Sequence, residues 1–292
     1  MSQLQELNLF YSNRELIDSG YGQTGPLSQK PGYDVMVEAE FGLMSITGHP
    51  DGKPTKVGVA ITDLTTGLYA VNAILTALFH RERSPLREGQ YIDVALSDCQ
   101  LASLTNVASS VLHGGTSQRW GNAHGNIVPY QSFPSLDGEI VIGCGNNIQF
   151  QKFLALVGRE DIAKDERFST NKSRVKHRNT LVPLLEGITQ SKTTSEWEIL
   201  LENTGIPCAP INDVKASLEH PHSLSRNMVQ DHGNKDTGEM RLIGHPIKYI
   251  TLDVGIKKRP PMLGEDSSDV LSRILGKNKD QIARLKHDGV IM

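Results

Sequence analysis

Residues 48–79 constrain the fold of this chain more than any other segment. Residues 48–56 hold two Gly and two Pro in nine positions, a composition that predicts a loop. A short apolar run, residues 57–61, follows. Beyond Asp63, apolar residues recur at the i, i+3/i+4, i+7 spacing of one helix face: Leu64, Leu68, Val71, Ile74, Leu75, Leu78 and Phe79. The segment therefore predicts a loop that leads into an amphipathic helix with an acidic residue at its start.

Asp63 has two interpretations at this position. An Asp at a helix start commonly caps the helix, because its carboxylate accepts unpaired backbone N–H groups of the first turn. The same N–H groups and the helix dipole would favour the ionised carboxylate that a nucleophile needs. Spacing alone favours the cap.

Composition and charge limit the classes of function. The 292 residues suffice for two domains, and 38% apolar with 22% charged residues is typical of a soluble globular protein. A net charge of −3 gives no electrostatic case for a nucleic-acid partner or an anionic membrane surface. No apolar run approaches the ~18 residues expected of a membrane span. Three dispersed cysteines, Cys99, Cys144 and Cys208, exclude a disulfide framework and suit a reducing compartment.

The first 18 residues show no targeting address. They lack an apolar signal-peptide core, and Glu6, Glu15 and Asp18 make them too acidic for a transit peptide.

Strand and helix patterns alternate in the first part of the chain. Residues 33–44 have a mixed apolar pattern that predicts a helix, residues 91–96 read as a strand, and residues 98–112 have helical spacing. This alternation predicts an α/β layer.

A change in composition at residues 114–125 indicates a linker into a second domain. Residues 130–133 and 139–142, joined by a turn at Asp137-Gly138, predict a hairpin. The segments after the hairpin are predicted as helices at 147–157, 174–189 and 194–203, an edge segment at 205–210, a hinge at 220–246, and short helices at 266–276 and 278–286.

The sequence Gly143-Cys144-Gly145-Asn146-Asn147 follows the second strand of the hairpin. It lacks the third glycine and the βαβ context of a dinucleotide-binding loop. A tight turn is one interpretation. The other is a ligand loop whose backbone N–H groups stabilise an oxyanion, with Gly143 and Gly145 needed for close approach or positive φ.

Metal and serine-hydrolase chemistry find no support in the sequence. The ten histidines, among them His113, His124, His220 and His222, show no recognised ligand spacing. No Gly-x-Ser-x-Gly elbow is present.

Several segments together resemble one enzyme family. They are SGYGQTGP at 19–26, PGYDVMVEAEFGLMSITG at 31–48, GVAITDLTTGLYA at 58–70, HGNIVPYQSFPSLDGEIVIGCGNNIQF at 124–150, DERFSTNKSRVKHR at 165–178, GIPCAPIND at 205–213 and RPPMLGEDSSDVL at 259–271. Their order and spacing resemble the family III CoA-transferases from Ser19 to the end of the chain. Residues 124–150 look most like the branch that transfers CoA from succinyl-CoA to glutarate or hydroxymethylglutarate.

The resemblance implies roles for particular residues. Asp63 matches the family's nucleophilic aspartate, which forms an acyl anhydride and then an enzyme–CoA thioester, and this match reverses the preference for a cap. Gly143, Gly145 and Asn146 match a mobile glycine loop. Tyr33, Asp34 and His124 are implied to lie near the substrate or CoA. The CoA thioester is a substrate, and neither a permanently bound cofactor nor a metal is implied.

The implied fold is α/β, with a split Rossmann-like large domain and an inserted small α+β domain. The large domain would comprise residues 1–115 and 240–292, and the small domain residues 116–239. Two such chains would form an interlocked homodimer, with no nucleic-acid or membrane partner. The location would be mitochondrial in a eukaryote and otherwise cytoplasmic.

Two departures from the family define the alternatives. Family members carry a longer segment, with the first strands and much of the CoA nucleotide pocket, before the match to residues 19–26. A truncated, catalytically impaired chain with a binding role or no role is therefore the first alternative. It would aggregate, bind CoA weakly and keep a folded core near 116–239. The second is an acyl-CoA racemase, which the resemblance disfavours because Tyr33 stands where racemases need histidine and Thr62 precedes Asp63 where they favour glycine.

Overall fold

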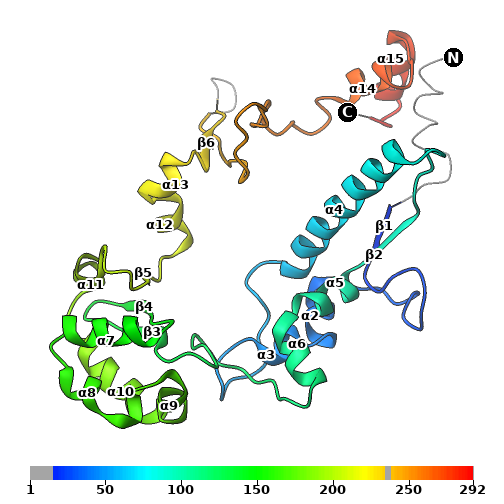
Figure 1. The fold of residues 1–292 in the computed structure, drawn as a ribbon. Coiled ribbons are helices and arrows are strands. Elements are labelled where there is room, and N and C mark those ends of the chain that lie inside the picture. The colour runs from blue at the N-terminus through cyan, green and yellow to red at the C-terminus, as the bar shows by residue number, and fades with distance from the viewer. Residues whose placement is uncertain (1–15, 234–237, 292) are drawn as a thin grey trace. The chain divides into compact units, whose positions relative to one another are not determined.

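The computed structural model describes residues 16–233 and 238–291. The acidic start of the chain, with Glu6 and Glu15, lies outside these residues. Helices and strands are mixed, as the predicted α/β class requires (Figure 1). Contacts divide the chain into two compact units, Met1–Pro210 and Ile211–Met292.

The first unit begins with a parallel pair of strands. Strand β1, Leu16–Ser19, pairs with β2, Ile92–Ala95, with Leu16 opposite Ile92 and Ser19 opposite Ala95. Strand β2 matches the strand predicted at residues 91–96, whereas β1 was not predicted from the sequence. A parallel pair needs a crossover connection, and here it carries α2 (Asp34–Glu40), α3 (Leu43–Ile46) and α4 (Ile61–Arg83).

The predicted helix at 98–112 is two helices. Helix α5, Leu96–Ser103, follows β2 directly, and α6 spans Thr105–Leu112. Thr105 has φ of 43°, outside the right-handed helical region, so the chain changes direction there. Helices α2 and α4 both pack against α5.

The linker between the two halves of this unit is fastened to the loop before α4. Arg119 donates through Nε to the carbonyl oxygen of His49 at 3.0 Å and through Nη2 to that of Gly52 at 2.8 Å. The N–H of Gly121 donates to the carbonyl oxygen of Gly48 at 2.9 Å. These bonds satisfy loop carbonyls that no helix or strand would use.

The second half of the unit has its own hydrophobic core. Strands β3 (Tyr130–Pro134), β4 (Glu139–Gly143) and β5 (Cys208–Pro210) form an antiparallel sheet in that order, which confirms the predicted hairpin and makes the predicted edge segment a strand. The helices that follow β4 are α7 (Asn147–Leu156), α8 (Glu160–Lys164), a 3-10 turn (Glu166–Phe168), α9 (Asn171–Lys176), α10 (Arg178–Thr189) and α11 (Thr194–Leu201). The core includes Phe133, Ile140, Phe150, Phe153 and Trp197, all at most 1% exposed.

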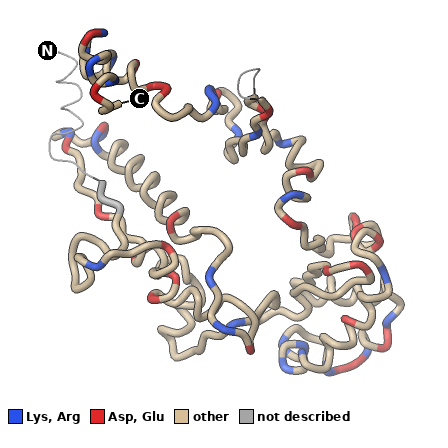
Figure 2. The backbone as a smooth tube through the Cα atoms, turned by 180° about the vertical axis from the view of Figure 1, so that it is seen from behind, with Lys and Arg blue, Asp and Glu red and all other residues tan. Residues whose placement is uncertain are grey.

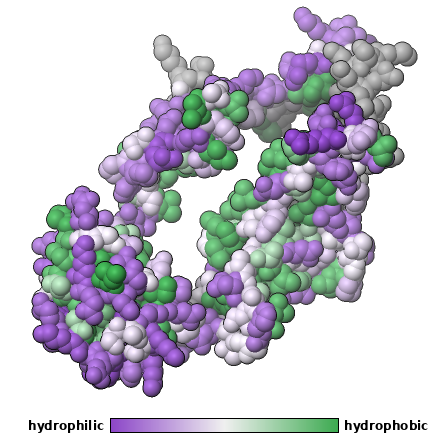
Figure 3. All heavy atoms as spheres, viewed as in Figure 1, coloured by the Kyte–Doolittle hydropathy of each residue, from purple (hydrophilic) through white to green (hydrophobic). Residues whose placement is uncertain are grey.

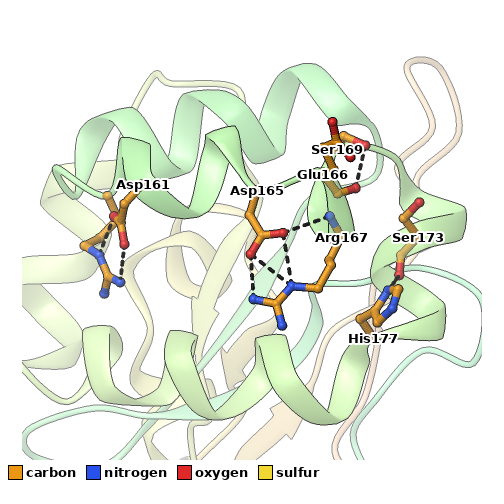
Figure 4. A network of polar contacts seen from close by, with 8 residues as sticks. Asp161, Asp165, Glu166, Arg167, Ser169, Ser173 and His177 are labelled. Carbon is orange, nitrogen blue, oxygen red and sulfur yellow. Dashed lines mark hydrogen bonds and ion pairs between the residues drawn. The ribbon is translucent and has the colours of Figure 1, made fainter.

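Short-range polar contacts stabilise the surface of these helices (Figure 4). Arg167 forms a bidentate pair with Asp165, through Nε and through Nη2 at 2.7 Å. Nδ1 of His177 lies 2.9 Å from the carbonyl oxygen of Ser173, one helical turn earlier. An exposed ion pair such as Arg167–Asp165 contributes about 0–1 kcal/mol.

The second unit contains short elements. They are α12 (Val214–Glu219), α13 (Pro221–Ser225), the antiparallel pair β6 (Val229–Asp231) and β7 (Arg241–Ile243), α14 (Ser267–Arg273) and α15 (Lys279–His287). Helices α14 and α15 confirm the two predicted tail helices. The predicted hinge at 220–246 contains a helix and a strand pair.

Helix α4 exposes much of its apolar face (Figure 3). Leu68 is 67% exposed and Phe79 is 60% exposed. Its charged residues lie at its two ends, Asp63 at one and 81–83 at the other (Figure 2). By length and composition this helix could cross a membrane, contrary to the expectation from the sequence. Core helices of soluble proteins meet the same criterion, so it assigns no membrane role.

Candidate active site

Asp63 is the third residue of α4, and the N-cap position belongs to Ala60. The cap comes instead from another helix. Oδ1 of Asp34, at the start of α2, accepts the backbone N–H of Thr62 at 2.8 Å and that of Asp63 at 3.3 Å. Asp34 therefore caps two first-turn N–H groups of α4.

Thr62 anchors the start of α4 on its inner side. Its side chain is buried, and Oγ1 donates to Oε1 of Gln100 on α5 at 2.6 Å. Its carbonyl oxygen accepts the hydroxyl of Thr66 at 2.7 Å. Asp63, one residue on, is exposed. A fixed backbone thus presents the Asp63 carboxylate at the surface of this half of the unit.

Tyr33 and Asp34 lie together at the start of α2, but they differ in environment. Tyr33 is the N-cap residue and is 73% exposed. Asp34 is half-buried and points to α4. One turn further along α2, Glu38 is 0% exposed, and its Oε2 accepts the N–H of Val57 at 3.0 Å. Burial raises the pKa of Glu38, the bond from Val57 opposes this, and the charge of Asp34 adds to the rise.

The glycine loop between β4 and α7 has its backbone donors occupied. The N–H of Gly143 donates to the carbonyl oxygen of Pro207 at 3.0 Å, and that of Cys144 to Pro129 at 2.8 Å. The N–H of Gly145 donates to Oε1 of Gln149 at 2.8 Å. Nε2 of Gln149 in turn donates to the carbonyl oxygen of Gly205 at 2.7 Å.

Neither glycine of this loop has positive φ, so that part of the expected reason for glycine is wrong. A Cβ on Gly143 would lie 3.4 Å from the ring of Tyr130, and one on Gly145 would lie 3.5 Å from Oε1 of Gln149. Both are ordinary contacts. A need for glycine here would come from an approaching ligand.

Asn146 and His124 flank the loop. Asn146 is the N-cap of α7, and its Oδ1 accepts the N–H of Gln149 at 2.9 Å. The ring of His124 stacks on that of Tyr130, with centroids 5.5 Å apart, and Tyr130 pairs with Gly143 across the sheet. The structure therefore forms two groups: Tyr33, Asp34 and Asp63 around α2 and α4, and His124 with the glycine loop around β3, β4 and α7.

A hollow of about 750 Å³ lies elsewhere in the first unit. The guanidinium of Arg178 lies 4.5 Å from the ring centroid of Trp120 at its wall, and Glu186 and Gln131 also line it. None of the predicted site residues is among its lining residues, so it is not the candidate active site.

Metal and thiol chemistry find little support among the described residues. In residues 16–233 and 238–291, no group of three or more His, Cys, Asp or Glu side chains is placed to hold a metal ion. Burial raises the pKa of Cys144, in the glycine loop, to about 12, against the opposing charge of Arg174. That thiol is protonated and unreactive near neutral pH.

The residues that sequence reasoning missed are those that hold the others. Glu38 accepts the N–H of Val57, Gln100 accepts the hydroxyl of Thr62 next to Asp63, and Gln149 accepts the N–H of Gly145. The i, i+4 spacing of Asp34 and Glu38 was the available signal, because it places two acids on one helix face.

Comparisons with known proteins agree on the family. Residues 16–267 match the sequence model of CoA-transferase family III. The succinyl-CoA:glutarate CoA-transferases of Mus musculus and Homo sapiens are 39% and 37% identical over 274 residues, 94% of this chain and 62% of each relative. The succinate–glutarate CoA-transferase of Agrobacterium fabrum is 37% identical over 88% of this chain and 64% of its own length.

Solved structures give the same result. A CAIB/BAIF family protein from Brucella suis superposes with a TM-score of 0.77 and 39% identity, over 89% of this chain and 67% of that one. The chain spans about 62% of the length of the mammalian relatives it matches. The extent of the family match, together with an aspartate held at the start of α4, leads to one conclusion: the chain belongs to CoA-transferase family III.

Proposed function

We propose that this protein transfers CoA from an acyl-CoA to a dicarboxylic acid through covalent intermediates on Asp63. The observation that carries the proposal is the placement of Asp63, whose backbone is fixed by Asp34 while its side chain is exposed. Family membership supports the reaction class.

The reaction proceeds by acyl transfers that balance without a proton or a redox partner. An Asp63 oxygen attacks the thioester carbon, the C–S bond breaks, and CoA leaves as thiolate from a mixed anhydride. The thiolate attacks the aspartyl carbonyl, which releases the donor acid and leaves an aspartyl–CoA thioester. The acceptor carboxylate attacks this thioester and expels the thiolate. The thiolate then attacks the acceptor carbonyl, which yields the new acyl-CoA and free Asp63.

Each tetrahedral intermediate needs hydrogen-bond donors to its oxyanion. We assign this role to the glycine loop, in particular the N–H of Gly145. That donor is bonded to Gln149, a side-chain acceptor that can rotate away, whereas Gly143 and Cys144 donate to backbone carbonyls. The N–H of Gly145 is thus the loop donor that can be freed for a substrate with the least change in the backbone.

The substrates follow from the names of the relatives. Mouse, human and Agrobacterium relatives are named as succinyl-CoA or succinate–glutarate transferases, and a relative from Chloroflexus aurantiacus as succinyl-CoA–D-citramalate CoA-transferase. Succinyl-CoA as donor and a dicarboxylic acid of the glutarate type as acceptor are therefore proposed here.

A mass-spectrometric experiment tests the proposal. The chain is incubated with succinyl-CoA, digested, and searched for CoA or succinyl adducts. We expect the adduct on the peptide that contains Asp63 and expect none in Asp63→Asn. An adduct on another residue, or turnover by Asp63→Asn, would refute the assignment.

The remaining expectations are part of the same proposal. A split Rossmann-like large domain with an insert at 116–239, and an interlocked homodimer, fit the apolar side chains that α4 exposes. Light scattering tests the dimer. A mitochondrial location in a eukaryotic source is tested by cell fractionation.

An impaired family member with a binding role or no role is the second candidate. The exposed apolar face of α4 favours it, because such surface invites association. It predicts CoA binding without an adduct, so the same experiment separates the two.

A further inference from the structure

The buried carboxyl group of Glu38 has one oxygen with no hydrogen-bond donor. Its Oε2 accepts the N–H of Val57, while Oε1 is buried and has no partner among the described residues. A buried carboxylate with an unsatisfied oxygen is costly, whereas the protonated acid has an O–H of its own to donate.

Asp34 is the acceptor available to that O–H. It lies one turn before Glu38 on the same face of α2, and, besides burial, its proximity and charge raise the pKa of Glu38. Two acids in contact in a buried site do not both ionise, because the second charge is opposed by the first. The other charged group acting on Glu38 is Lys56, on the loop before α4.

We propose that Glu38 holds a proton and donates it in a hydrogen bond to Asp34, and that this bond positions the backbone of Asp63. Asp34 then uses its carboxylate on two sides. It accepts the proposed O–H of Glu38, and its Oδ1 accepts the N–H groups of Thr62 and Asp63 at the start of α4. Glu38 is a positioning residue, since it acts through Asp34, and the inference rests on the proposed role of Asp63.

The shared proton also sets the charge beside the nucleophile. With one proton, Asp34 and Glu38 together carry a single negative charge next to the start of α4. With none they would carry two, which would repel an ionised Asp63 and weaken the cap. A neutral Glu38 therefore keeps the start of the helix compatible with an ionised nucleophile.

Infrared spectroscopy of the unliganded 292-residue chain at neutral pH tests the proton directly. We expect a protonated-carboxyl band that disappears in Glu38→Gln. We also expect its loss in Asp34→Asn, whose amide N–H₂ would donate to an ionised Glu38. Glu40→Gln is the matched control on the same helix: Lys30 and Tyr21 donate to Glu40 and lower its pKa, so this change should leave the band in place.

The rate of CoA adduct formation tests the positioning. Glu38→Gln keeps a donor to Asp34 and should form adduct at a near-normal rate. Glu38→Leu removes the donor and should slow formation about tenfold or more, because a reacting group misplaced by about 1 Å can cost ~100-fold. Circular dichroism restricts the comparison to folded variants, and the infrared result stands if Glu38→Leu fails to fold.

The outcomes separate this inference from the proposed function. A band in the wild-type chain without any adduct would contradict the proposed function and leave the shared proton established. Identical spectra of wild type and Glu38→Gln would overturn the inference, and so would a band that survives in Asp34→Asn. Equal adduct rates in Glu38→Gln and Glu38→Leu would overturn the positioning role.

Discussion

The carboxylate of Asp34 accepts the backbone N–H of Asp63 at 3.3 Å, so one acid caps the helix that carries the other. The sequence allowed Asp63 to be a helix cap or a nucleophile, and in the structure Asp34 is the cap. Asp34 satisfies two first-turn donors of α4, and the side chain of Asp63 is exposed.

This division predicts that two substitutions lower stability by unequal amounts. Asp34→Ala removes the cap from two N–H groups and should lower the free energy of unfolding by about 1–2 kcal/mol. Asp63→Ala changes an exposed side chain and should cost less than Asp34→Ala. Urea denaturation of both variants measures the difference. A larger loss in Asp63→Ala would assign the cap to Asp63 after all.

The glycine loop gives a second prediction, on activity rather than stability. Gly145→Val should reduce CoA adduct formation strongly and the melting temperature little, because φ is not positive and a Cβ meets Oε1 of Gln149 at an ordinary 3.5 Å. Gly205→Val is the structural control: its φ of +77° predicts a clear loss of stability. Equal thermal losses in the two variants would make Gly145 a structural turn residue.

Local patterns predicted the elements whose signals lie within a few residues. The hairpin around Asp137-Gly138 formed as expected, since Ser135 N–H and the Gly138 carbonyl close the turn at 2.9 Å. Helix α11 formed where Thr193 and Glu196 make a capping box. Helix α9 ends at Lys176, and α10 begins after His177, a break that apolar spacing over 174–189 does not reveal.

Long-range partners could not be predicted in the same way. The cap on α4 joins residues 34 and 63, and the Thr62–Gln100 bond joins α4 to α5. Strand β1 is four residues long and is a strand because β2, more than seventy positions later, pairs with it. Only the folded chain brings such residues together, and the resemblance identified Asp34 and Asp63 without the cap that joins them.

Cys144 predicts a loss of stability at alkaline pH. Burial raises the pKa of its thiol from 9.0 to about 12, so between these values the unfolded chain loses a proton that the folded chain keeps. Its contribution to stability is full below pH 9 and falls as pH rises towards 12. Denaturation of wild type and Cys144→Ala across this range should give a smaller pH slope for the variant. Equal pH slopes for wild type and Cys144→Ala would contradict the raised pKa of the Cys144 thiol.

Replacing the buried Arg174 should lower the free energy of unfolding substantially. Its side chain is 0% exposed, Nε donates to the carbonyl oxygen of Val128 at 2.6 Å, and Nη1 donates to that of Phe168 at 3.1 Å. Arg174→Leu leaves both carbonyls unsatisfied at about 1–3 kcal/mol each, so a loss of roughly 2–5 kcal/mol is expected. Arg159→Gln, which breaks an exposed pair with Asp161, should cost about 0–1 kcal/mol. Chemical denaturation measures the free energy of unfolding of both variants. Similar losses would show that the buried hydrogen bonds of Arg174 stabilise the fold no more than an exposed ion pair does.

The densely packed second half of the first unit should survive limited proteolysis. Its core runs from Val128 to Ile206 and contains most of the large buried side chains, whereas residues 114–118 are exposed and carry no helix or strand. Proteases need locally unfolded chain, and such opening is rarest where apolar burial is dense. Beyond Pro210 the exposed residues Lys215 and Arg226 offer trypsin its sites. We expect a resistant fragment that starts near the linker and ends shortly after residue 210, identified by intact mass. Early cleavage within α7 or α10 would show that this half depends on the rest of the chain for its stability.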